Sequence, residues 1–112
     1  MHAYHAHIYF TLAQTGLATQ VRHNILQAIP GLSYTGQLIP MPIGPHPLPM
    51  FELHIPTAIK AQAIASIDAL RAGLSVLIHP VQQDELAAHS TDAIWLGREL
   101  TLNLAMFNHP RS

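Results

Sequence analysis

Histidine is the side chain in this sequence with the clearest capacity for chemistry. The chain of 112 residues contains 9 His against 5 Lys plus Arg, and imidazole is both a common metal ligand and the usual acid–base group near neutral pH. Two of these residues, His5 and His7, alternate with apolar residues in the segment 4–10, a pattern typical of a β-strand. The two imidazoles therefore share one face of this strand with Tyr9.

Hydrophobic periodicity predicts the elements that must position these side chains. Strands are expected at 4–10, 33–40, 50–55 and 74–79, helices at 17–29 and from Thr57 to Gly73, and a short extra strand at 93–96. This β-α-β-β-α-β order favours an α+β, ferredoxin-like sandwich over the single domain 1–112, with a C-terminal extension. Its antiparallel sheet, in the order 4-1-3-2, carries both helices on one face.

This fold predicts a cluster of polar side chains on the open face of the sheet. The apolar faces of the strands must pack against the helices, and alternation then places the polar residues on the other face. Because the first strand lies between the fourth and the third, these residues lie near one another: His5, His7, Glu52, His54 and His79. Two His and a carboxylate are typical of non-haem Fe(II) oxygenases, whereas three His and a water suit zinc. The residues alone leave both ions open.

A proline-rich segment supplies a further candidate. The sequence "PMPIGPHPLP", residues 40–49, holds five of the 9 prolines and predicts a stiff, ordered loop. His46 within it is pre-organised, which suits a residue that contacts a metal or substrate. We expect His23 to lie on a helix surface, and His2 and His109 to be solvated near the termini.

Composition narrows the class of protein. The chain has no Cys, so disulfides, thiolate metal sites and a Cys nucleophile are excluded. A net charge of -1 without a basic stripe argues against nucleic-acid binding. No signal peptide or membrane span is apparent, which predicts a cytoplasmic protein. Charged residues make up only 10% of the chain, and we expect a homodimer that covers some of its apolar surface.

Four motifs together resemble those of the DOPA 4,5-dioxygenase family, a family of aromatic ring-opening dioxygenases. They are "HAHIYF", "GPHPLPMFEL", "SVLIHP" and "AIWLG", in the order of the family and at about its spacing, from about Tyr4 to Gly97. The resemblance implies a ferredoxin-like fold and often a dimer. It also implies extradiol cleavage of a catechol such as DOPA (3,4-dihydroxyphenylalanine), using O2 and non-haem Fe(II).

The resemblance assigns roles to individual histidines. The motif positions place His7, His46 and His79 as metal ligands, with Glu52 as the carboxylate alternative to His46. His89 falls on a fourth family histidine, and it is an acid–base candidate together with His5.

Further residues are candidates for binding the substrate. They are Glu52 and His54 on the open face, and Tyr9 and Trp95, which could line an aromatic pocket or belong to the core.

The sequence also departs from the family at two places. Gln82-Gln83-Asp84 stands where the family often has Thr-Gly-Asp, and Ala88-His89-Ser90 stands for Asp-His-Thr. These changes leave open the catechol, the position of cleavage and the activity itself. The alternatives are a non-catalytic small-molecule-binding module and a zinc-dependent enzyme.

Overall fold

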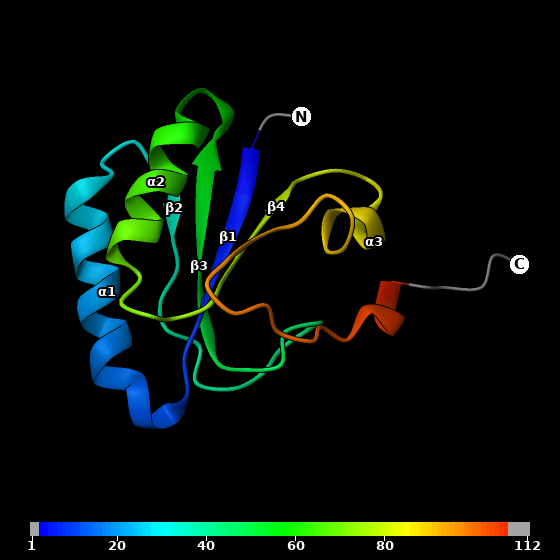
Figure 1. Ribbon diagram of the computed structural model, residues 1–112, viewed down its shortest axis with the longest axis horizontal. Helices are drawn as coiled ribbons and strands as arrows, with labels where there is room; N and C mark the ends of the chain where they lie inside the picture. Colours follow the sequence, from blue (N-terminus) through cyan, green and yellow to red (C-terminus); the bar gives the residue numbers. More distant parts are fainter. Residues whose placement is uncertain (1–2, 108–112) are drawn as a thin grey trace, which may run out of the picture.

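A computed structural model describes residues 3–107 of the chain (Figure 1). His2 and His109 lie outside these residues. The strands are β1 (Ala3–Tyr9), β2 (Tyr34–Thr35), β3 (Met50–Pro56), β4 (Val76–Pro80) and β5 (Ile94–Leu96). The helices are α1 (Thr15–Ala28), α2 (Lys60–Leu70) and the short α3 (Glu85–Ala88), with 3-10 turns at Leu12–Gln14, Thr57–Ile59 and Leu104–Phe107.

The strands form one antiparallel sheet in the order β2-β3-β1-β4-β5. This confirms the α+β fold predicted from the element order, with β1 between β3 and β4. The extra strand β5 pairs with the outer edge of β4. The longest ladder joins β1 to β3 over seven residue pairs, from Ala3↔Pro56 to Tyr9↔Met50. The register of this ladder therefore decides which side chains of β1 and β3 meet.

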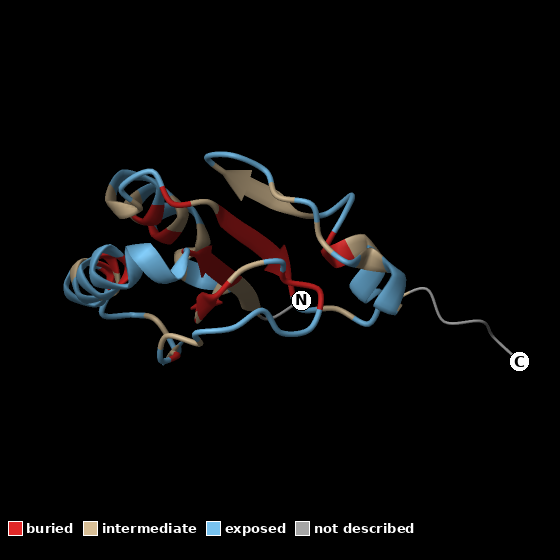
Figure 2. Ribbon diagram, turned by 90° about the horizontal axis from the view of Figure 1, so that it is seen from below, coloured by how far each residue is buried: buried red, intermediate tan, exposed pale blue. Residues whose placement is uncertain are grey.

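Helices α1 and α2 cover one face of the sheet, where the main core lies. Alternate residues of the three central strands point into this core and are fully buried, such as Ile8, Phe51 and Ile78. They pack against Val21 and Ile25 of α1 and against residues of α2. Figure 2 shows the buried strands beside the two long helices. Burial of this apolar face forces the polar residues of β1 and β3 to the opposite face.

A second, smaller core covers part of that opposite face. It is built from Tyr9, Met50 and Leu77, and from partly buried side chains of two long loops and β5 that pack on them: Ile39, Leu48, Ala93, Trp95, Leu100 and Leu102. The proline-rich loop and the segment after β5 thus lie over the sheet face that the helices leave open.

Two local predictions differ from the structure. The second strand is shorter than 33–40: it is β2 plus an isolated bridge between Ile39 and Met50. Pro40 and Pro42 lack an N–H, so the ladder cannot continue beyond the bridge. The helix expected from Thr57 to Gly73 begins with the 3-10 turn Thr57–Ile59, and α2 itself covers only Lys60–Leu70. The C-terminal extension is mostly irregular over 98–107, with a 3-10 turn at its end.

No helix within residues 3–107 is long and apolar enough to cross a membrane. The homodimer expected from the low charge content stays a prediction.

Replacing Phe51 by Ala should strongly destabilise the fold. Its side chain is 0% exposed and joins the sheet to the helices. Large-to-small substitutions of this kind cost about 3–5 kcal/mol, from lost burial and the cavity left behind. The control is Leu12→Ala, at a side chain that is 63% exposed, for which we expect a change within about 0.5 kcal/mol. Urea unfolding would measure both, and similar losses in the two variants would contradict this core.

Candidate functional site

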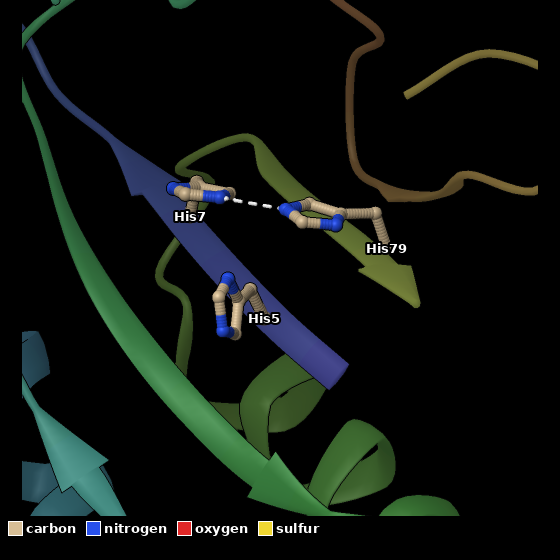
Figure 3. Close-up of side chains that lie close together, drawn as sticks. All are labelled: His5, His7 and His79. Carbon is tan, nitrogen blue, oxygen red and sulfur yellow. Dashed lines mark hydrogen bonds between the residues drawn. The ribbon is translucent and has the colours of Figure 1, made fainter. Parts of the chain in front are cut away.

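Three histidines converge on the face of the sheet opposite α1 and α2. His5 and His7 come from β1 and His79 from β4, and the ladder sets His5 opposite His79. One ring nitrogen from each of the three lies within 4.8 Å of the others. Figure 3 shows His7 and His79 pointing at one another, with a ring nitrogen of His5 turned toward the pair. The strand alternation inferred from sequence therefore brings these side chains together.

His7 and His79 meet head to head. Their Nε2 atoms are 3.0 Å apart and their ring planes differ by 11°. The Nδ1–H of His79 donates to the carbonyl of Pro80 at 3.0 Å, because a carbonyl only accepts. In neutral His79 the Nε2 therefore carries a lone pair, and His7 must donate to it through its own Nε2–H. This leaves His7 Nδ1 as a buried atom without a hydrogen-bond partner.

The proline-rich loop carries His46 across the sheet face to this cluster. The His46 ring centroid is 4.1 Å from that of His7, and its Nδ1 is 2.7 Å from the Tyr9 hydroxyl. Burial raises the pKa of Tyr9, so its hydroxyl stays protonated and donates to His46 Nδ1. The remaining proton of neutral His46 then lies on Nε2. His46 is not in the group of three converging nitrogens within the described chain.

His89 approaches the cluster from the other side. It follows α3, a short helix whose N-terminus is capped by the Asp84 side chain, which accepts from the backbone N–H of Ala87 at 3.0 Å. The Nδ1–H of His89 donates to the carbonyl of Glu85 at 2.8 Å, and its ring centroid is 4.1 Å from that of His79. Neutral His89 therefore keeps a lone pair on Nε2.

The residue before His89 is one of the two places where the sequence departs from the motifs that it resembles. Buried Ala88 stands there in place of the Asp that often precedes this histidine. The backbone carbonyl of Glu85 orients the ring instead. Gln82, the other departure, donates to Asp92 at 2.8 Å and so ties the segment before α3 to the one after it.

Glu52 and His54 of β3 form a second group with His5. His54 Nε2 is 2.6 Å from Glu52 Oε2, and the His54 ring stacks on His5 at 3.9 Å with an angle of 11°. Ligand atoms of these three residues also lie within 4.8 Å of one another. However, the lone pairs of two stacked imidazoles run side by side in parallel planes and do not point to a common ion. This group is therefore less suited to a metal than His5, His7 and His79.

Burial keeps the clustered imidazoles neutral. Desolvation lowers the pKa of His7 well below its usual value, and neighbouring His46 and His79 lower it further. Desolvation also lowers the pKa of both His46 and His79 to about 4. A histidine must be neutral to bind a metal, so no proton has to be removed from these rings at neutral pH.

A cavity of about 560 Å³ adjoins the cluster at His89. Its walls include Trp95, Leu100 and Leu102, while a smaller cavity of about 70 Å³ touches His5, His79 and His89. The larger volume suits a small aromatic ligand. Of the residues predicted to bind substrate, Trp95 lines this cavity. Tyr9 is not part of the wall of this cavity, and its side chain is buried, at 1% exposure.

The other two substrate-binding candidates lie elsewhere on the face. Glu52 lines a different cavity of about 350 Å³, and half-buried His54 stacks on His5 and contacts Tyr34. Sequence reasoning missed the leucines of the segment after β5 and the two backbone carbonyls that orient His79 and His89. Nothing in the sequence signals either carbonyl, because every residue carries one.

Comparisons with known proteins agree with one another. The sequence model of the Dopa 4,5-dioxygenase family matches residues 4–106. A relative from Amanita muscaria, named DOPA 4,5-dioxygenase, is 30% identical over 91% of this chain and 48% of its own length. An "Uncharacterized 21.2 kDa protein" of Botryotinia fuckeliana is 37% identical over 58% of this chain and 40% of its own. The chain thus spans about half the length of the curated relatives it matches.

A solved structure has the same fold. The crystal structure of a "putative dioxygenase" from Nostoc punctiforme superposes with a TM-score of 0.88 at 30% identity, and it covers 96% of this chain and 92% of that one.

The buried histidines predict a loss of stability on acidification. Because the folded state lowers the pKa of His46 and His79 from 6.5 to about 4, the unfolded chain binds more protons between these values. The free energy of unfolding should therefore be highest above pH 6.5 and fall as the pH drops toward 4. Urea titrations with a chelator present would measure this slope. His79→Gln should flatten it, while exposed His23→Gln should not; equal slopes in both variants would count against the assignment.

Proposed function

Because the chain belongs to the Dopa 4,5-dioxygenase family, we propose that it is an extradiol dioxygenase that opens the ring of a catechol such as DOPA with O2 at a His-ligated non-haem Fe(II). The observation that carries the proposal is the convergence of His5, His7 and His79 beside a cavity that His89 lines. Both oxygen atoms of O2 enter the product, one at each of the two ring carbons whose bond is broken.

The donor set fits a divalent ion of this kind. Three imidazole nitrogens, one from each histidine, lie within 4.8 Å of one another and can hold one ion. The 3.0 Å between the Nε2 atoms of His7 and His79 is close to the spacing of adjacent nitrogens bound at about 2.1 Å. The Pro80 carbonyl already sets the tautomer that a ligating His79 needs. When bound, iron supplies positions for both catechol oxygens and for O2. Zinc could occupy the same three nitrogens.

Geometry favours His5 over His46 as the third ligand. The resemblance places His46 in this role, but Tyr9 donates to its Nδ1 and its ring packs on that of His7. Glu52, the carboxylate alternative, lies nearest to the Nδ1 edge of His7, away from the Nε2 that meets His79. In our proposal His46 instead shields the site from water and presents an Nε2–H.

His89 is the acid–base residue in this proposal. Its Nδ1–H is engaged by Glu85, so the free Nε2 accepts a proton from a catechol hydroxyl and returns it when the ring opens. The wall formed by Trp95, Leu100 and Leu102 holds the aromatic ring of the substrate by apolar and stacking contacts.

The metal ligands can be separated by substitution. We expect His7→Ala, His79→Ala and His5→Ala each to lose bound Fe(II) and catechol-dependent O2 uptake after anaerobic loading. His46→Gln should keep the metal. Metal content after desalting, an oxygen electrode and the yellow absorbance of the ring-opened semialdehyde would measure this with DOPA, dopamine and catechol. His23→Ala is the control. Metal lost in His46→Gln but retained in His5→Ala would reverse the assignment, and uptake absent with every catechol despite bound Fe(II) would refute the function.

The role of His89 has a distinct signature. His89→Gln should retain Fe(II) but lower kcat by about 10²–10⁴-fold, the usual contribution of a general base. Metal content after desalting and steady-state oxygen uptake would show both effects. Loss of the metal in His89→Gln would make His89 a ligand and contradict the proposal.

A further inference from the structure

His7 holds the only buried side-chain nitrogen or oxygen atom between residues 3 and 107 that has no hydrogen-bond partner. The atom is Nδ1, and the side chain is 3% exposed. A buried polar atom without a partner is costly, and native structures seldom retain one without a reason. The reason lies in the two residues on either side of the ring, His79 and Glu52.

In the metal-free form, His7 carries its proton on Nε2, which is the nitrogen that would bind a metal. Because the Pro80 carbonyl holds the proton of His79 on Nδ1, His7 donates through Nε2 in the metal-free form. His7 Nδ1 then presents a lone pair to Glu52 Oε1, 3.6 Å away. Two acceptors face one another, which explains why this distance exceeds that of a hydrogen bond.

A metal ion bound to His7 Nε2 would reverse this arrangement. To bind through Nε2, neutral His7 must carry its proton on Nδ1. Glu52 is placed to receive it, because an approach of about 0.7 Å would bring Oε1 to hydrogen-bond distance. The other oxygen, Oε2, is held by His54 at 2.6 Å, and the His54 ring rests on His5. The hydrogen bond from His54 to Oε2 therefore helps to hold the Glu52 carboxylate in place.

We propose that Glu52 is a positioning residue that accepts the Nδ1–H of His7 when His7 binds a metal through Nε2, so that metal binding shifts the tautomer of His7. This inference rests on the metal site of the proposed function but not on its catechol chemistry. It gives Glu52 a role other than ligand or substrate-binding residue. Carboxylates that accept from metal-bound histidines typically strengthen metal binding about 10–100-fold.

Affinity for Zn(II), used as a diamagnetic probe, tests the proposal. We expect Glu52→Ala to weaken binding about 10–100-fold in a chelator competition. Glu52→Gln should recover part of the loss, because an amide oxygen can still accept from Nδ1. The matched control is Asp68→Asn on α2, which also exchanges a carboxylate for an amide but lies on the helix side of the sheet, where it pairs with Arg71. Circular dichroism would verify that each variant is folded.

Side-chain ¹⁵N spectra provide a readout that a merely structural role would not change. Wild-type His7 should carry its proton on Nε2 in the metal-free protein and on Nδ1 with Zn(II) bound. Equal Zn(II) affinity in wild type and Glu52→Ala, or an unchanged His7 tautomer on loading, would overturn the inference, as would a wild type that binds no Zn(II). A wild type that binds Zn(II) with the expected shift but whose Fe(II) form opens no catechol would refute the proposed function alone.

Discussion

The contact between His7 and His79 constrains the rest of the site. Their Nε2 atoms are 3.0 Å apart on neighbouring strands, and two neutral rings that meet in this way can share only one proton. The Pro80 carbonyl decides which ring provides it. That choice leaves His7 Nδ1 without a partner, next to a carboxylate that cannot donate. The site is thus strained electrostatically in the metal-free form, and a cation bound by both histidines would relieve the strain.

This contact depends on the core on the far side of the sheet. Ile8 and Phe51 sit opposite one another in the β1–β3 ladder, both fully buried against the helices, and they set the register. With the register set, His7 must face Glu52 across the same ladder. A shift of one residue would turn the histidines into the apolar core. Hydrophobic packing therefore sets the geometry of the polar cluster, although no residue of that core takes part in the proposed mechanism.

Alternation and strand order could be read from the sequence because both follow from burial. They were enough to predict the sheet and to place His5, His7 and His79 on one patch. The position of His46 could not be derived in this way, since it depends on a loop whose prolines restrict its path without specifying it. The tautomers were also beyond reach, because backbone carbonyls set them in His79 and His89. Only the folded chain shows which carbonyl lies beside which ring.

The same burial that lowers stability in acid would favour binding of the metal that we propose. Desolvation disfavours the charged imidazolium of His7, His46 and His79, so protons compete poorly for the nitrogens that a cation would occupy. A more exposed cluster would be easier to fold but would be protonated more readily near neutral pH. His89 and His54 lie at the two margins of this buried group, and one hydrogen bond orients each ring: His89 donates to the Glu85 carbonyl and His54 to the Glu52 carboxylate. Burial therefore keeps the central histidines neutral, while separate hydrogen bonds orient the rings of His54 and His89.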